Sequence, residues 1–102
     1  MIISVDFQEA HRLLSEQKNI LLLDVREEEE YITGHAIDAV LFTLADINAE
    51  TAAEIIPSKS TPVMVYCRSG VRSRAAAQTL DRLGYETVYD LGGLIGWPYG
   101  LE

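Results

Sequence analysis

The sequence predicts an α/β fold in which helices pack against a mostly parallel β-sheet. Short runs of branched apolar residues alternate along the chain with segments of helical periodicity. Two of these runs, residues 20–23 and 63–66, are apolar throughout, which is typical of strands covered on both faces. The chain has 102 residues, of which 48% are apolar, and this suffices for one core. We therefore predict a single domain over residues 1–100 and interpret Leu101 and Glu102 as an expression-tag junction.

Caps and breakers mark the elements of the first half of the chain. Asp6, with Glu9 three residues later, forms a capping-box pattern, which predicts that a helix begins there. A short helical segment over residues 27–32 is ended by Gly34. In order, the expected elements are a strand at 2–5, a helix at 6–18, a strand at 20–23, a helix at 27–32 and a strand at 39–41.

The second half of the chain shows the same alternation. Pro57 closes one helix, and Gly84 is the expected stop of another. The expected elements are a helix at 45–56, a strand at 63–66, a helix from about 73 to 83 and a strand at 87–89. The last three form a βαβ unit, so their two strands are expected to run parallel.

The charge of the chain is unevenly distributed. Its net charge of −8 argues against nucleic acid as a partner, because nucleic-acid binding needs a positive surface. Residues 58–84 nevertheless carry five basic side chains and one acidic side chain, a charge of +4. This basic segment surrounds the only cysteine, Cys67. The pattern suggests a small anion as the partner.

The composition excludes several classes of protein and site. Apolar runs such as residues 20–23 are far too short to cross a bilayer, and no basic, apolar start marks a signal peptide. A single cysteine excludes an internal disulfide and a thiolate-cluster metal site. The acidic run at 27–30 does not indicate a metal site, because neighbouring helical residues face different directions. We expect a cytoplasmic protein with no metal and no cofactor, and with neither a membrane nor nucleic acid as a partner.

One loop combines the features that activate a cysteine. Cys67 follows the second apolar strand and precedes a helix, at the sheet edge where open α/β folds bind ligands. The start of that helix offers unpaired N–H groups, and Gly70 lets the loop curl so that they converge. Three guanidinium groups follow, those of Arg68, Arg72 and Arg74, although we interpret Arg74 as a solvated helix residue. Together these groups favour the thiolate of Cys67 over the thiol.

Ionising this thiol requires a definite amount of stabilisation. An ordinary thiol is ~3% ionised at pH 7, and lowering its pKa by two units takes roughly 2.7 kcal/mol. An exposed helix N-terminus supplies about 0.3–1 kcal/mol, so loop amides and arginines have to supply the rest. The alternative is that Cys67 is an inert buried apolar side chain, as many single cysteines are. Its expected setting, electropositive and partly exposed on a Gly/Ser/Arg loop, favours a reactive cysteine.

Three motifs occur in order along the chain. They are Asp24-Val25-Arg26 with Glu30-Tyr31 and Gly34-His35, then Cys67-Arg68-Ser69-Gly70-Val71-Arg72, then Gly92-Gly93 with Trp97. In this order they resemble the motifs of the rhodanese-type sulfurtransferases, and the resemblance covers essentially the whole chain. One departure is visible over residues 34–39, where the family's Gly-His-Ile-Pro-Gly-Ala reads Gly-His-Ala-Ile-Asp-Ala.

The resemblance implies a fold and a reaction. The fold is a rhodanese-like three-layer sandwich, with helices on both faces of a central, mostly parallel sheet of about five strands. The reaction is that of a thiosulfate sulfurtransferase, in which the Cys67 thiolate takes a sulfane sulfur from thiosulfate or a persulfide and passes it to cyanide or a thiol. A protein is a further candidate as sulfur donor or acceptor. The resemblance places donor binding on the residues that follow the cysteine: Arg68, Ser69, Gly70, Val71, Arg72 and Ser73.

Two other functions use the same cysteine. Phosphatases and arsenate reductases of the related fold have five residues between cysteine and arginine, which would place the arginine at Ser73. Here the arginine comes one position earlier, at Arg72, and the shorter loop favours a sulfane sulfur over phosphate. A non-catalytic carrier that accepts sulfur from a partner protein would also depend on Cys67.

Three further polar residues lie near the expected site. Asp24 and Arg26 follow a buried strand and either line the pocket or tie loops together, Arg26 being four residues before Glu30. We favour structural support, because paired charges near sheet edges are seldom catalytic. His35 either gives a proton to a leaving group or bonds to the backbone of a turn, and attack by a thiolate does not need the proton.

Overall fold

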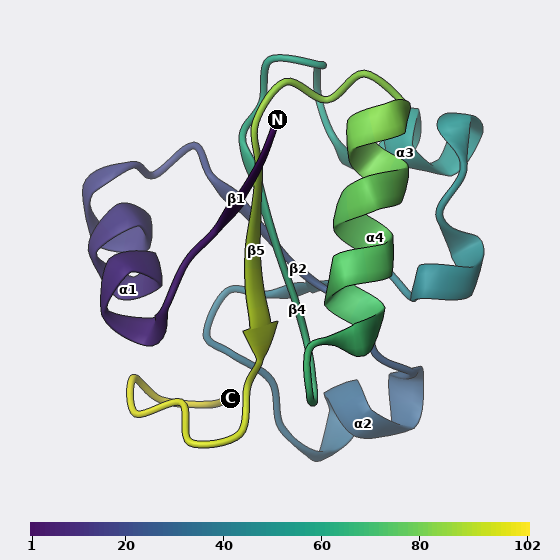
Figure 1. Ribbon diagram of the computed structural model, residues 1–102. Helices are drawn as coiled ribbons and strands as arrows, with labels where there is room; N and C mark the ends of the chain where they lie inside the picture. Colours follow the sequence, from purple (N-terminus) through teal and green to yellow (C-terminus); the bar gives the residue numbers. More distant parts are fainter.

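The computed structural model describes residues 1–102, which form an α/β fold of three layers (Figure 1). In chain order the elements are β1 (Ile2–Ser4), α1 (Phe7–Glu16), β2 (Leu21–Asp24), α2 (Glu28–Thr33), β3 (Val40–Leu41), a 3₁₀ turn (Leu44–Asp46), α3 (Ala49–Ile55), β4 (Val63–Cys67), α4 (Val71–Arg82) and β5 (Val88–Gly93). Figure 1 shows α1 on one side of the sheet and α3 with α4 on the other, while α2 lies at the end where β5 points.

The sheet has five strands in the order β1-β5-β4-β2-β3, and every neighbouring pair is parallel. This confirms the predicted class of fold. β4 lies at the centre and all five of its residues are buried. Val63, Val65 and Cys67 face the core beneath α3 and α4, whereas Met64 and Tyr66 face the core beneath α1. Burial on both faces explains why this segment is an uninterrupted apolar run.

The predicted caps hold in the structure. The Asp6 carboxylate accepts a hydrogen bond from the Glu9 amide at 2.8 Å, which fixes the start of α1. Gly84 follows α4 with a φ of +99°, a left-handed conformation that suits glycine. None of the helices combines the length and the apolar composition needed to cross a bilayer.

Most element boundaries differ from the predicted ones by one or two residues, and three differences bear on the fold or the site. The single helix predicted over 45–56 is wrong, because the Asn48 side chain accepts the amides of Glu50 and Thr51 and starts α3 anew after the 3₁₀ turn. α4 begins at Val71, two residues earlier than expected, directly after the loop glycine. The last strand extends to Gly93, well beyond the predicted end at residue 89.

A bulge near the end of β5 sets the register beside β4. Val65 pairs with Asp90 but Tyr66 pairs with Gly92, so one residue of β5 is skipped. The Asp90 carboxylate accepts a hydrogen bond from the Gly92 amide at 3.0 Å and so stabilises the bulge. As a result Gly93 lies directly beside Cys67.

The chain end packs against the turn after α2. Leu101 forms an antiparallel bridge with Ala36, and the Glu102 amide donates to the His35 carbonyl at 2.8 Å. Asp38 has a φ of +69° in this turn, at the position where the family pattern has glycine. Aspartate tolerates this conformation better than most residues, so the turn survives the sequence departure.

Candidate active site

The sulfur of Cys67 lies at the carboxyl end of β4, where the chain turns into α4. Gly70 makes this tight turn with a φ of +105°, which is open to glycine and strained for other residues. Its amide donates a hydrogen bond to Sγ at 3.0 Å. Cys67 itself is the last residue of β4 and is completely buried, so the expected partly exposed position on the loop is wrong. Pairing with Gly93 explains this, because it carries the strand one residue further.

Hydrogen bonds from the loop decide the ionisation of this buried thiol. Burial raises the pKa of Cys67, but the amides of Ser73, Gly70 and Ser69 and the Ser73 hydroxyl lower it, and the net pKa lies below the ordinary value. Ser73 is itself fully buried, and its hydroxyl donates to the Gly70 carbonyl at 3.1 Å. The loop therefore forms a small cradle of N–H groups around one sulfur atom.

A pH titration of alkylation tests this cradle. The rate at which iodoacetamide modifies Cys67 is expected to rise with pH and to level off at a lower pH than for a free thiol, because only the thiolate reacts. Ser73→Ala removes a hydroxyl that lowers the pKa of Cys67 and holds the Gly70 carbonyl, so it should raise the pKa of Cys67 and slow alkylation at pH 7 several-fold. Ser69→Ala keeps its backbone amide and serves as the control with an unchanged midpoint. A wild-type midpoint equal to that of free cysteine would contradict the cradle.

The end of β5 supports the loop from the other side. The Cys67 carbonyl accepts a hydrogen bond from the Leu94 amide at 2.9 Å. A Cβ atom at Gly93 would lie 2.6 Å from the carbonyl oxygen of Arg68 and 2.9 Å from the Cα of Ser69. Real Cβ atoms do not come this close, so only glycine lets the loop pack here. Gly93 therefore acts as a positioning residue for the cradle.

The arginines after the cysteine differ in their surroundings. Arg68 and Arg74 are exposed and form no ion pair. Arg72 instead points toward α2, where both of its terminal nitrogens donate to the Glu30 carboxylate at 2.6 and 3.0 Å. Val71 is 77% exposed and takes no part in the cradle. Of the six residues predicted to bind the donor, Gly70 donates its amide to the sulfur, and the amides of Ser69 and Ser73 help to lower the pKa of Cys67.

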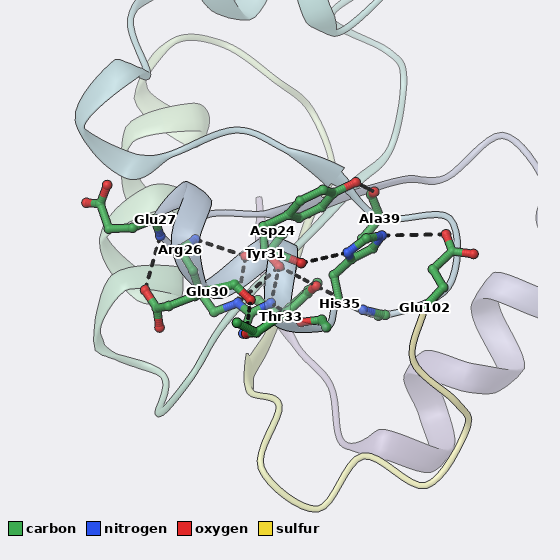
Figure 2. A network of polar contacts seen from close by, with 12 residues as sticks. Asp24, Arg26, Glu27, Glu30, Tyr31, Thr33, His35, Ala39 and Glu102 are labelled. Atoms are coloured by element: carbon green, nitrogen blue, oxygen red, sulfur yellow. Dashed lines mark hydrogen bonds and ion pairs between the residues drawn. The ribbon is translucent and has the colours of Figure 1, made fainter.

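Asp24 and Arg26 form a buried ion pair at the neighbouring strand end (Figure 2). Asp24 is fully buried, and its Oδ2 accepts from Nη2 of Arg26 and from the Tyr66 hydroxyl, each at 2.6 Å. The Tyr66 oxygen accepts the Ala36 amide at 3.1 Å, and Arg26 also donates to the Gly34 carbonyl at 2.8 Å. Burial and the adjacent Asp24 raise the pKa of Tyr66, so its hydroxyl keeps the proton that it donates. These contacts join β2, β4 and the turn after α2.

His35 belongs to the same region but not to the cradle. Its ring stacks on Tyr31, with centroids 3.7 Å apart, and its Nδ1 lies 2.9 Å from the Tyr31 carbonyl. Its Nε2 lies 3.7 Å from Oε1 of Glu102. Figure 2 shows the two side chains facing each other. These are the backbone and turn contacts that the favoured interpretation of His35 anticipated.

The comparisons with known proteins agree with this geometry. A family model described as Rhodanese-like domain matches residues 6–98. The chain belongs to the rhodanese-like family. A rhodanese-like domain from Anabaena has a TM-score of 0.87 at 25% identity, over 100% of this chain and 80% of that chain. A structure described as rhodanese with anions from E. coli has a TM-score of 0.75 at 31% identity, over 81% of this chain and 96% of that chain.

A more distant protein shares the fold alone. A human single-domain sulfurtransferase has a TM-score of 0.73 at 21% identity and matches 88% of each chain. Two residues near the site of this chain were not predicted from the sequence to be site residues. Glu30 and Gly93 belong to the sequence motifs, but no role at the site was predicted for them. Their place in the motifs was the only indication that the sequence offered. Their contacts with Arg72 and with the loop backbone needed the folded structure.

Proposed function

We propose that this rhodanese-like domain is a sulfurtransferase that carries a sulfane sulfur as a persulfide on Cys67. The observation that supports this most directly is the Gly70 amide donating to Sγ at 3.0 Å in a loop whose hydrogen bonds lower the pKa of the thiol. Membership of the rhodanese-like family supports the same reaction class. The donors are thiosulfate or a persulfide, and the acceptors are cyanide or a thiol.

The reaction is a double displacement. The Cys67 thiolate attacks the outer sulfur of thiosulfate, an S–S bond forms, and sulfite leaves with the electron pair of the bond that breaks. The acceptor, as cyanide or a thiolate, then attacks the outer sulfur of the persulfide and releases the Cys67 thiolate. Converging amides of the loop suit the terminal sulfur of the persulfide, which carries negative charge. Because Cys67 is fully buried, a donor reaches it only when the atoms that cover it move aside.

The roles of the surrounding residues follow from their contacts. Ser69, Gly70 and Ser73 hold the thiolate and the persulfide through the hydrogen bonds described above. Arg68 and Arg72 are our candidates for holding the anionic part of the donor. Arg72 has the stronger motif position, but its charge is paired with Glu30, whereas the charge of Arg68 has no partner. Asp24 and Arg26 support the neighbouring strand end without touching the sulfur.

Mass spectrometry tests the proposal. After incubation with thiosulfate, the wild-type protein is expected to gain the mass of one sulfur atom on the peptide that contains Cys67, and to lose it when cyanide is added. Cys67→Ser is the control and should gain nothing. A wild-type protein that never gains the sulfur, or a Cys67→Ser variant that turns over like wild type, would refute the proposal. Hydrolysis of an aryl phosphate that depends on Cys67 would instead favour the phosphatase alternative.

A further inference from the structure

We propose that Glu30 sets the charge of the preferred sulfur donor by neutralising Arg72. The domain then favours a donor with a single negative charge, such as a thiosulfonate or a persulfide, over the thiosulfate dianion. This inference rests on the proposed sulfurtransferase function and names the donor class for the same site.

The pair between Glu30 and Arg72 is well defined. Two hydrogen bonds, Nη1 to Oε1 at 2.6 Å and Nη2 to Oε2 at 3.0 Å, match the planar fork of the guanidinium to the carboxylate. The carboxylate is further fixed because Oε1 accepts the Glu27 amide at 3.1 Å. The hydrogen bond from Arg72 lowers the pKa of Glu30 to about 2, so the carboxylate is ionised at any physiological pH. The pair therefore presents no net charge to an approaching donor.

Arg72 lies in the first turn of α4, two residues after Gly70, whose amide donates to the sulfur. The hydrogen bond to Glu30 is the main cause of the raised pKa of Arg72, and the charge of Cys67 adds a smaller contribution. The local sequence suggested a basic surrounding for the cysteine, with a charge of +4 over residues 58–84. Folding places the acidic start of α2 against this segment, with Glu27, Glu28 and Glu29 exposed beside the pair. Of the three arginines that follow the cysteine, Arg68 and Arg74 form no ion pair, and their charges are exposed to screening by solvent.

Two donors that differ by one charge isolate this effect. Methanethiosulfonate has one negative charge and thiosulfate has two, and each offers a terminal sulfur bonded to a sulfonyl-type sulfur. In both reactions the Cys67 thiolate forms an S–S bond to the terminal sulfur. The bond between the two donor sulfurs breaks, and methanesulfinate or sulfite leaves with its electron pair. The chemistry is the same, so a change in their relative rates reports the charge around the site.

The experiment compares kcat/KM for the two donors in wild type and in variants. Glu30→Gln frees the charge of Arg72 and is expected to raise the thiosulfate-to-methanethiosulfonate ratio about tenfold, the size of one charge interaction at a partly exposed site. The increase should shrink at high salt. Glu29→Gln removes the same charge from an exposed position without a partner, and Glu30→Asp keeps the charge. Both should retain the wild-type ratio.

A second measurement separates this inference from the proposed function. Iodoacetate is an anion and iodoacetamide is neutral, and both alkylate Cys67 whether or not the protein transfers sulfur. Glu30→Gln should raise the rate with iodoacetate relative to that with iodoacetamide. The inference is wrong if Glu30→Gln lowers kcat/KM equally for both donors. It is also wrong if the donor ratio and the alkylation ratio stay as they are in Glu29→Gln. In either case Glu30 only holds the loop. If neither donor loads wild-type Cys67 while the alkylation ratio responds, the proposed function fails but the charge effect stands.

Discussion

Replacing Gly93 by alanine is expected to lower kcat/KM for sulfur transfer about 100-fold, because a misplacement of roughly 1 Å at a reacting group has an effect of this size. The added Cβ atom would lie 2.6 Å from the Arg68 carbonyl oxygen and 2.9 Å from the Ser69 Cα. Both contacts are with backbone, so no flexible side chain can move aside. The loop has to shift, and the amide of Gly70 moves away from the sulfur with it.

The neighbouring glycine provides the matched control. A Cβ atom at Gly92 meets nothing within 4 Å, but its φ of +82° is strained for any other residue. Gly92→Ala is therefore expected to cost stability, about 1–2 kcal/mol for a left-handed residue, while the folded fraction keeps its activity. Steady-state kinetics with thiosulfate or methanethiosulfonate measure kcat/KM of both variants, and urea unfolding measures their stability. A Gly93→Ala variant with wild-type kcat/KM would show that the loop does not depend on this contact.

The fold was predictable because its signals are local. The apolar runs at 20–23 and 63–66 and the cap at Asp6 each indicate one element, and alternation alone then favours a parallel sheet. The failures also have local causes. The predicted helix over 45–56 contains Asn48, whose side chain competes for the backbone amides and starts a new helix. The signal was present, but the helical composition of the segment outweighed it in the prediction.

The cysteine loop was predictable for a similar reason, whereas its electrostatics were not. The position of Cys67 between a strand and a helix and the glycine three residues later define the turn from the sequence alone. The charges of residues 58–84 predicted a basic site. However, Glu30, which lies 42 residues before Arg72 in the sequence, neutralises the arginine of the cysteine motif. Backbone amides and Ser73 instead lower the pKa of Cys67. Such partners come together only through tertiary contacts.

Replacing Asp24 by asparagine is expected to lower the free energy of unfolding by about 3–5 kcal/mol, the usual result of removing one partner of a buried ion pair. Asp24 is completely buried, and the side chain of Arg26 is only 11% exposed. Asparagine can still accept the Tyr66 hydroxyl, but the guanidinium would be left in the interior without a compensating charge. Urea unfolding measures this loss of stability, provided that the m-value is the same in the variant and in wild type. Glu28→Gln removes the same charge from an exposed site on α2 and should stay within about 0.5 kcal/mol of wild type.

A double variant shows whether the charge or the hydrogen bonds of this pair matter more. In Asp24→Asn with Arg26→Gln both charges are gone, so the penalty of an unpaired buried guanidinium is gone as well. The double variant should therefore be more stable than Asp24→Asn alone, although still less stable than wild type, because the Gly34 carbonyl loses its donor. A loss below about 1 kcal/mol for Asp24→Asn, within the range of an exposed pair, would mean that Arg26 turns into solvent when its partner is neutral. In that case the strand end beside Cys67 tolerates rearrangement, and the cradle depends on β4 and β5 alone.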